Sequence, residues 1–440
     1  MRSRKLMSLC LVGSLMLSAC ALLLSGCARR DMRPVLRFAI ASDVHVEDEG
    51  RSEVEEARLE TMWRMAYRHA DESPTGYHGL DAVVFAGDFT NRGTLSSMQT
   101  FKQICETHRR EGTELVVSLG NHEFFSDGDT TVERYAQVFS VPEDQHLVLN
   151  GFHMIKLSPD GEAFGKDKLD WLRRELEAAA KDTPRRPVFV IQHQHVKGTV
   201  YGSTGWGVDG LYEVLKDFPQ AVDFSGHSHF PIQDDRSLWQ GDFTAVGTGT
   251  LSYTEMGLNG VSTDYVFPHG KQGDYKLWEA SGARDYGVFQ IVEVDRWGNI
   301  LLTGYDLDSE TLLFTRRIDR PIKPSAFQTN EEKARSAPSP EFPKGSVCRI
   351  ETDGEGETVL WVPQAESSAF IESYCAEIYL GDTCVETLYA LSGQIFCPIP
   401  REIRICLGRR TEQTYTVRIY AVGAYGQRSE EPLTVTLPRE

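Results

Sequence analysis

The chain has 440 residues, of which 40% are hydrophobic and 25% are charged. This composition excludes a collagen-like or disordered protein, and the length allows two or three domains that each bury their own core. The 64 acidic residues outnumber the 46 Lys and Arg, which gives a formal net charge of −18. Because that charge repels phosphate backbones, we expect no specific nucleic-acid partner.

The first residues have the pattern of an export signal. Positive charges precede a nearly continuous apolar stretch at 6–24, and small residues then lead to Cys27. The sequence Leu-Ser-Gly-Cys resembles a bacterial lipobox, whose cysteine is lipidated. We therefore predict a lipoprotein signal peptide at 1–26 and a tether at 27–33. The mature chain would be lipid-anchored on the extracytoplasmic side of the bacterial cell-envelope membrane. An uncleaved signal anchor is the alternative, since the apolar stretch is nearly long enough to span a bilayer.

Short apolar runs then alternate with helical patterns as far as residue 319. Strands are predicted at 35–41, 81–86, 114–118, 187–191 and 222–225, and helices at 53–70, 96–110 and 167–181. Strands without intervening helices are predicted at 243–253, 286–294 and 300–306. The alternation indicates a parallel sheet with crossover helices, and the later strands extend it into a mixed α/β sandwich.

The last part of the chain has a different pattern. Five prolines and no periodicity between Pro321 and Gly345 indicate a linker at 320–345. Short alternating strands follow at 358–362, 376–380 and 414–422, which predicts an all-β sandwich domain over 346–440. The segment from Tyr425 to Pro432 resembles the last hairpin of a fibronectin type III domain. Contact with a protein or glycan partner is one use open to such a domain, and spacing of the first domain from the envelope is the alternative.

Five cysteines crowd this C-terminal region. Export permits disulfides, but an odd number of cysteines leaves the connectivity open. One or two bridges and a set of free buried thiols are both consistent with the sequence.

Five groups of polar residues each follow a predicted strand in the first region. They are Asp43 with His45, Asp88, Asn121 with His122, His193, and His227 with His229. Ligands of open α/β sheets bind at the carboxyl ends of the strands, so we expect these groups to converge on one edge. A mixture of carboxylate, amide and imidazole suits transition metals better than calcium. Glycines before three of the groups would allow the backbone to approach closely.

At these residues, from Arg37 to Asp306, the chain resembles the calcineurin-like metallophosphoesterase family. The resemblance implies a four-layer αββα metallophosphoesterase sandwich over 34–319. It also implies a metal-dependent phosphoric ester hydrolase that holds two divalent or trivalent transition metal ions (Mn, Fe, Zn, Ni or Co). Carried over by position, one ion would be held by Asp43, His45 and His229, the other by Asn121, His193 and His227, with Asp88 bridging the two.

The resemblance assigns His122 a catalytic role in hydrolysis of a phosphodiester or phosphomonoester. Two ions held by a shared carboxylate would activate a hydroxide that attacks the phosphorus. His122 would donate a proton to the leaving oxygen or hydrogen-bond the transition state. The alternative is a supporting contact from His122 to Asp43 or Asp88.

Three further residues are candidates for substrate binding. Arg92 lies in a segment that resembles related protein phosphatases, whose corresponding Arg binds phosphate, although Asn91 stands where they carry an acidic residue. A solvated loop arginine is the alternative. His195 shares a face with His193 and would contact substrate or be solvated, while His193 is the predicted ligand because it directly follows the strand. Trp206 lies in a Gly-rich loop between two ligand groups and would stack on a base or sugar. A plain surface turn is the alternative for that loop.

Two other functions stay open at this point. A metal-dependent nuclease would use the same ions, but the charge balance and the lack of an Arg- and Lys-rich stripe argue against it. A surface adhesin would keep the first domain as a scaffold and bind its partner through the β-sandwich, but a scaffold would be expected to have lost ligands. We therefore predict an exported metal-dependent phosphoesterase, whose substrate the motifs do not specify.

Overall fold

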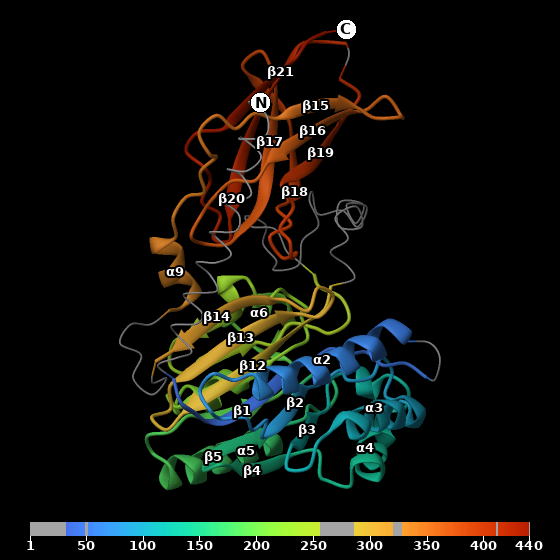
Figure 1. The fold of residues 1–440 in the computed structure, drawn as a ribbon, viewed down its shortest axis with the longest axis vertical. Coiled ribbons are helices and arrows are strands. Elements are labelled where there is room, and N and C mark those ends of the chain that lie inside the picture. The colour runs from blue at the N-terminus through green and yellow to red at the C-terminus, as the bar shows by residue number, and fades with distance from the viewer. Residues whose placement is uncertain (1–31, 49–51, 256–285, 320–327, 411, 440) are drawn as a thin grey trace.

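The computed structural model describes residues 32–48, 52–255, 286–319, 328–410 and 412–439. The predicted signal peptide and Cys27 lie outside the described residues. In Figure 1 the strand-rich C-terminal domain lies above the larger N-terminal domain. Within the part of the chain that the structure describes, no helix has the length and apolar character needed to cross a membrane.

The N-terminal domain contains, among the described residues, two six-stranded sheets. The first has the order β14 (Leu312–Ile318), β13 (Ile300–Asp306), β12 (Val288–Asp295), β1 (Pro34–Ala41), β2 (Ala82–Ala86) and β3 (Glu114–Ser118). The second has the order β10 (Leu238–Gln240), β11 (Thr244–Gly247), β9 (Ala221–Ser225), β6 (Val188–Ile191), β5 (Phe152–Lys156) and β4 (Gln145–Leu149). Strands β1, β2 and β3 are parallel, as are β5, β6, β9 and β11. Each sheet therefore combines parallel strands with antiparallel neighbours.

The two sheets pack face to face through a shared apolar core. Alternate residues of β1, namely Leu36, Phe38 and Ile40, point into this core because side chains of a strand alternate between its faces. The ring of Phe38 lies 5.2 Å from that of Phe189 and 5.9 Å from that of Phe224, both in the second sheet. The remaining faces of the sheets turn outward.

Helices cover both outer faces. The first sheet is covered by α2 (Glu53–Asp71), α3 (Leu95–His108) and α4 (Thr131–Phe139), and the second by α5 (Lys166–Asp182) and α7 (Leu211–Leu215). Helix α3 begins after Thr94, whose side chain accepts a hydrogen bond from the backbone N–H of Ser97. Because the order of layers is helix, sheet, sheet, helix, the predicted four-layer α/β sandwich is confirmed.

Two predicted segments differ from the structure. The strand expected at 243–253 is confined to β11, and the residues after it form a buried loop against the end of β1, where Leu251 N–H donates to Ser42 O and Ser252 N–H to Asp43 O. Part of the predicted linker is helical, as α9 (Asn330–Ser336). The sequence signal for this helix is a capping box on Thr329, which the prediction of a linker from the prolines did not take into account.

The C-terminal domain is an all-β sandwich, as predicted. One sheet has the order β15 (Arg349–Thr352), β16 (Thr358–Pro363) and β19 (Glu402–Gly408). The other has the order β18 (Thr383–Leu391), β17 (Ile371–Leu380), β20 (Tyr415–Gly423) and β21 (Leu433–Leu437). Leu360, Tyr374 and Ile419 belong to the core between them. The five cysteines of this domain are free thiols, as in the second alternative above, but only Cys375 is buried, and Cys384 is exposed.

Candidate metal centre

The polar groups meet where strands of both sheets end. The ends of β1, β2 and β3 carry Asp43, His45, Asp88, Asn121 and His122, and the ends of β6 and β9 carry His193, His227 and His229. The prediction of one sheet edge therefore needs a correction, because the site lies between two sheets. Contacts across the gap include the backbone N–H of His227, which donates to Asp43 Oδ2 at 3.0 Å.

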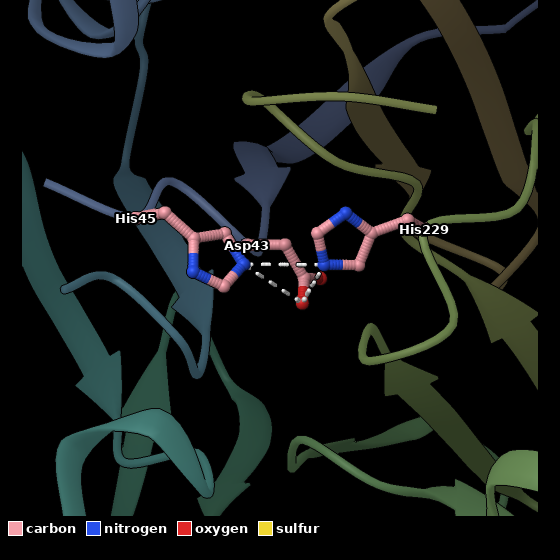
Figure 2. Close-up of side chains that lie close together, drawn as sticks. All are labelled: Asp43, His45 and His229. Carbon is pink, nitrogen blue, oxygen red and sulfur yellow. Dashed lines mark hydrogen bonds and ion pairs between the residues drawn. The ribbon is translucent and has the colours of Figure 1, made fainter. Parts of the chain in front are cut away.

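Asp43, His45 and His229 form the first ligand cluster (Figure 2). The Nε2 atoms of the two histidines are 3.1 Å apart, and His229 Nε2 lies 3.2 Å from Asp43 Oδ1. His45 Nε2 is 4.0 Å from the same oxygen. All three side chains are buried and converge on one point, as ligands of a single ion must.

Asp88 is the centre of a second cluster. His193 Nε2 lies 3.0 Å from Asp88 Oδ2 and 3.1 Å from Asn121 Oδ1. The ring of His227 packs edge-on against that of His193 at 5.0 Å, and Asp88, His193 and His227 present ligand atoms close enough for one ion. Asp88 also groups with His45 of the first cluster and with His122, so this carboxylate lies between the two sets.

The outer nitrogens of two of these histidines are held by backbone carbonyls. His193 Nδ1 is 2.8 Å from Ala86 O, and His229 Nδ1 is 2.9 Å from Tyr253 O. Because a carbonyl oxygen only accepts, Nδ1 carries a proton in both rings, and Nε2 is the nitrogen that faces the cluster. This is the arrangement of histidines that bind metals.

The charge states also suit a cation. Burial by itself raises the pKa of Asp43, but the neighbouring histidines, led by His229, outweigh it and hold the pKa below its ordinary range. The pKa of Asp88 is likewise lowered, by His193 against the effect of burial. Burial, together with the charge of His229, lowers the pKa of His45 to about 3. Burial lowers the pKa of His193 and of His229, but Asp88 and Asp43 respectively outweigh it and raise both, that of His193 to about 10. A bound cation would replace these ring protons, since metal ligands must be deprotonated. Carboxylates and imidazoles form a donor set that fits transition metal ions.

Five of the cluster residues have a left-handed backbone. The φ angles are 53° at Asp43, 56° at His45, 50° at Asp88, 70° at His227 and 57° at His229. Such a conformation costs a non-glycine residue about 1–2 kcal/mol and is concentrated at functional sites, where the surrounding structure enforces it. Here the backbone N–H of Asp43 donates to Gly87 O, and that of His45 donates to Asp88 O.

Two glycines permit the close packing of these loops, as predicted. A Cβ atom on Gly120 would lie 2.2 Å from Asp88 Oδ1. On Gly226 it would lie 2.2 Å from Ser42 Oγ and 2.4 Å from Asp43 Oδ2. Any side chain at either position would displace a carboxylate of the site.

Glu123 supports both loops, a role that the sequence analysis missed. Its buried carboxylate accepts backbone hydrogen bonds from Asp88 (3.0 Å), Thr90 (2.8 Å) and Gly120 (2.7 Å). Burial, followed by the charge of Asp88, raises the pKa of Glu123 to about 8. The available signal was an acidic residue directly after the Gly-Asn-His block.

His122 lies at the outer side of the cluster. Its Nδ1 is 2.9 Å from Asn91 O, its Nε2 is 3.9 Å from Asp88 Oδ2, and its backbone N–H donates to Asp88 Oδ1 at 2.9 Å. The side chain is 26% exposed, whereas those of Asp88 and His193 are buried. His122 can therefore be reached from solvent while it stays beside the ligands.

The prediction for His195 needs correction. The residue is buried, and its two ring nitrogens lie 2.8 Å from Ser225 Oγ and 2.8 Å from Ser228 Oγ. Burial, with a smaller contribution from His227, lowers the pKa of His195 to about 3. A residue with both nitrogens bonded inside the protein is neither solvated nor placed against substrate. Instead it connects β9 to the loop that carries two ligands.

Exposed aromatic rings lie against the two partly exposed histidines of the cluster, His122 and His227. Trp206, in α6 (Ser203–Trp206), is 38% exposed and meets the ring of His227 perpendicularly at 5.3 Å. Phe125 is 48% exposed, with its ring 4.4 Å from that of His122. Trp206 was predicted from its Gly-rich loop, whereas Phe125 was not predicted, and its one signal in the sequence is its position shortly after His122. Arg92 is exposed, one residue beyond the carbonyl that holds His122.

Comparisons with known proteins bear on residues 36–231, which match the model of the calcineurin-like phosphoesterase family. No curated protein matches the chain. Among solved structures, purple acid phosphatase PPD1 from yellow lupin (Lupinus luteus) seeds is 14% identical, with a TM-score of 0.44, over 65% of this chain and 55% of that one. This chain thus spans little more than half of that phosphatase. A cytokine receptor complex is 18% identical, with a TM-score of 0.17, over 36% of this chain and 74% of that one.

Proposed function

We propose that this chain is a dinuclear metal-dependent enzyme that hydrolyses phosphodiesters or phosphomonoesters. The match of residues 36–231 to the calcineurin-like phosphoesterase family supports this proposal. The observation that carries the proposal is the position of Asp88 between two sets of buried ligands. The residues that would hold one ion are Asp43, His45 and His229, those that would hold the other are Asn121, His193 and His227, and Asp88 would bridge them.

The donor set supports transition metals. When bound, two such ions lower the pKa of a coordinated water from about 15.7 towards about 7 and neutralise charge on the phosphate oxygens. Asn121 adds an oxygen ligand without adding negative charge, so the site stays attractive to an anionic substrate. The ionised carboxylates and the fixed tautomers of His193 and His229 pre-organise the remaining ligands.

We propose His122 as the catalytic proton donor. The carbonyl of Asn91 holds Nδ1–H and so fixes the plane of the ring, which leaves Nε2 at the partly exposed edge of the site. In its doubly protonated form, the ring would donate the Nε2 proton to the leaving oxygen, and in either form it orients the phosphoester beside Asp88.

We propose that Trp206 and Phe125 contact the organic part of the substrate. They pack on the two cluster histidines that reach the surface, so a phosphoester that approaches there passes between aromatic rings. Planar aromatic or sugar groups pack well on such rings. Arg92 would reach a phosphate oxygen from the segment that holds His122.

Hydrolysis of p-nitrophenyl phosphate and bis(p-nitrophenyl) phosphate, together with metal analysis, tests the function. Asp88→Ala and Asn121→Ala should each lower turnover by about 10³-fold or more. They should also lower the metal content and leave the circular dichroism spectrum unchanged. Asp209→Ala, which alters an exposed carboxylate, is the matched control and should keep wild-type turnover. Unchanged turnover in Asp88→Ala would overturn the proposal, and a wild-type protein without metal would favour the scaffold alternative.

We propose that the enzyme is exported and lipid-anchored through Cys27. The support is the charged, apolar and small-residue pattern that ends at this cysteine. Labelling of cells with a radioactive fatty acid should mark the wild-type chain but not Cys27→Ala. Label that persists in the variant would exclude this anchor.

For the C-terminal domain we propose a fibronectin type III-like fold that offers a surface to a protein or glycan. Its sheets of three and four strands and its final hairpin region support this proposal. Solution of the domain's structure together with a glycan-array screen would test both parts.

A further inference from the structure

A buried charge cluster joins the C-terminal domain to the N-terminal domain. Glu372, in β17 of the C-terminal sandwich, is fully buried, and its Oε1 lies 2.8 Å from Nη2 of Arg236. The same guanidinium donates to Asp234 Oδ2 at 2.6 Å. A buried carboxylate without a cation is strongly unfavourable, so Glu372 depends on the N-terminal domain for its charge partner.

Tyr201 belongs to the same cluster. Its hydroxyl donates to Glu372 Oε1 at 3.1 Å, and its backbone N–H donates to Arg236 O at 3.0 Å. The guanidinium carbon of Arg236 lies 3.6 Å from the centre of the Tyr201 ring. The hydroxyl, the ring and the backbone of Tyr201 are thus all fixed by the Glu372–Arg236 pair.

Tyr201 leads directly into the segment that carries Trp206. The backbone N–H of Trp206 donates to Gly202 O at 2.8 Å, which closes a tight turn. Gly202 has φ of 90°, and a Cβ atom there would lie 2.6 Å from Cβ of Ser228. Ser228 lies between the candidate ligands His227 and His229, so the backbone of this segment runs close to the metal centre and a displacement of Tyr201 would be felt there.

Apolar contacts close the interface around the charges. Ile232 and Val288 of the N-terminal domain share a buried cluster with Phe370, Ile395 and Ala424 of the C-terminal domain. Gln233 Nε2 also donates to Ile395 O at 2.9 Å. Contacts that exclude water strengthen the ion pair at their centre.

We infer that Glu372 is a positioning residue of the active site, acting through Arg236 and Tyr201 on the segment that presents Trp206. The C-terminal sandwich is then part of the substrate-binding apparatus as well as a separate binding module. This inference rests on the proposed function, since it concerns the binding of a phosphoester beside the metal ligands. The physical basis is charge: a Gln at 372 keeps the size but presents a neutral group to Arg236 and the tyrosine hydroxyl.

The test compares Glu372→Gln with Glu377→Gln in the full-length, metal-loaded protein. Glu377 lies on the same strand and pairs with Arg428 at 2.7 Å, away from the interface cluster. With bis(p-nitrophenyl) phosphate, Glu372→Gln should raise KM by about fivefold or more while kcat stays within about twofold. Glu377→Gln should leave both constants unchanged. Metal content should match the wild type in both variants.

A double-mutant cycle separates positioning from a general loss of stability. If Glu372 acts through the Trp206 segment, Glu372→Gln in a Trp206→Ala background should change KM by less than about twofold. An equal KM increase in both backgrounds, or an unchanged KM in Glu372→Gln, would overturn the inference.

Tyr201→Phe removes only the hydroxyl and should shift KM in the same direction, which keeps the test available should Glu372→Gln fold poorly. A wild-type protein without hydrolysis would defeat the proposed function, whereas hydrolysis without these KM shifts defeats the inference alone.

Discussion

Buried polar groups lie within strand β1, at Arg37, and just beyond its carboxyl end, at Asp43 and His45, and the two places handle charge differently. At Arg37 the protein satisfies every donor of the guanidinium, with Glu293 Oε1 accepting from Nε and Nη2. The remaining acceptors are Ser73 Oγ and the carbonyls of Tyr77 and Gly79. Beyond the other end, Asp43 and His45 meet His229 with two imidazole nitrogens facing one another at 3.1 Å. The Arg37 network is complete within the protein, whereas the network at Asp43 would be completed by the proposed cation.

The difference between the two places separates buried polar residues with a structural role from those of a binding site, according to whether the protein supplies all their partners. A buried charge whose partners all lie within the protein contributes to the fold, and its loss is felt as instability. Buried carboxylates and imidazoles that converge without a protein cation mark a binding site. The position of each network in the strand supports this distinction. Open α/β sheets bind ligands at the carboxyl ends of their strands, and only the network at Asp43 lies at that end of β1.

The largest effect is expected from removal of the metals, because it should affect the site at Asp43 and leave the Arg37 network intact. Dialysis against a chelator is expected to abolish hydrolysis and to lower the Tm. Ions that bind only the folded state stabilise it by about 3–4 kcal/mol at 100 to 1,000 times Kd. Differential scanning fluorimetry with and without chelator measures the second effect. Asp88→Ala should show no response to chelator, and a wild-type Tm that ignores chelator would contradict the assignment.

His122→Ala should lower kcat by about 10²–10⁴-fold, because a positioned proton donor contributes that much. Metal content should remain that of the wild type, since His122 is proposed as a proton donor and not as a ligand. His108→Ala, which changes a histidine on α3 outside the site, is the matched control. Loss of metal in His122→Ala would show instead that this histidine is a ligand.

In the complete network around Arg37, Glu293→Gln should lower the free energy of unfolding by about 3–5 kcal/mol, because it leaves Arg37 buried without its anion. Glu310→Gln, which breaks a surface pair with Arg64, should lower it by about 1 kcal/mol or less. Urea unfolding measures both. Activity per folded molecule should change little in either variant.

The same pair predicts a pH dependence. Burial would raise the pKa of Glu293, but His69 and Arg37 outweigh it and lower the pKa to about 2. Because the folded-state pKa lies below that of the unfolded chain, the stabilisation is complete above about pH 4.5 and is lost as the pH falls through about 2. The stability of Glu293→Gln should lack this acid transition. An equal transition in both proteins would assign it to other groups.

A smaller effect is expected at Asp223, a buried carboxyl whose partner among the described residues is the amide of Gln192 at 3.2 Å. Burial raises the pKa of Asp223 to about 7, against the smaller effect of Gln192. With the folded-state pKa above the unfolded one, wild-type stability should fall as the pH rises from about 4 to about 7. The free energy of unfolding of Asp223→Asn, taken relative to that of the wild type, should therefore be higher at pH 8 than at pH 5, by roughly 1–4 kcal/mol. A difference that is constant with pH would contradict the assignment.

Much of the fold could be predicted because its signals are local. Apolar runs and helical spacing identified β1, β2, β3, α2 and α5 to within a few residues, since burial of one face imposes a period on the sequence. Helix α9 was missed because its signal is a capping box in a proline-rich segment. Local patterns report on neighbours along the chain and carry no information about partners far from them.

The sequence by itself determined the chemistry available to the candidate site, because the types of candidate ligand, their order and their places at strand ends follow from short motifs. Only the tertiary structure decided that the ligands come from two facing sheets. It also decided that His195 braces a loop and that Glu372 reaches Tyr201 across 171 positions of the chain. The physical reason is that hydrogen bonds and ion pairs act over a few ångströms of space, and such proximity arises only when the domains have packed.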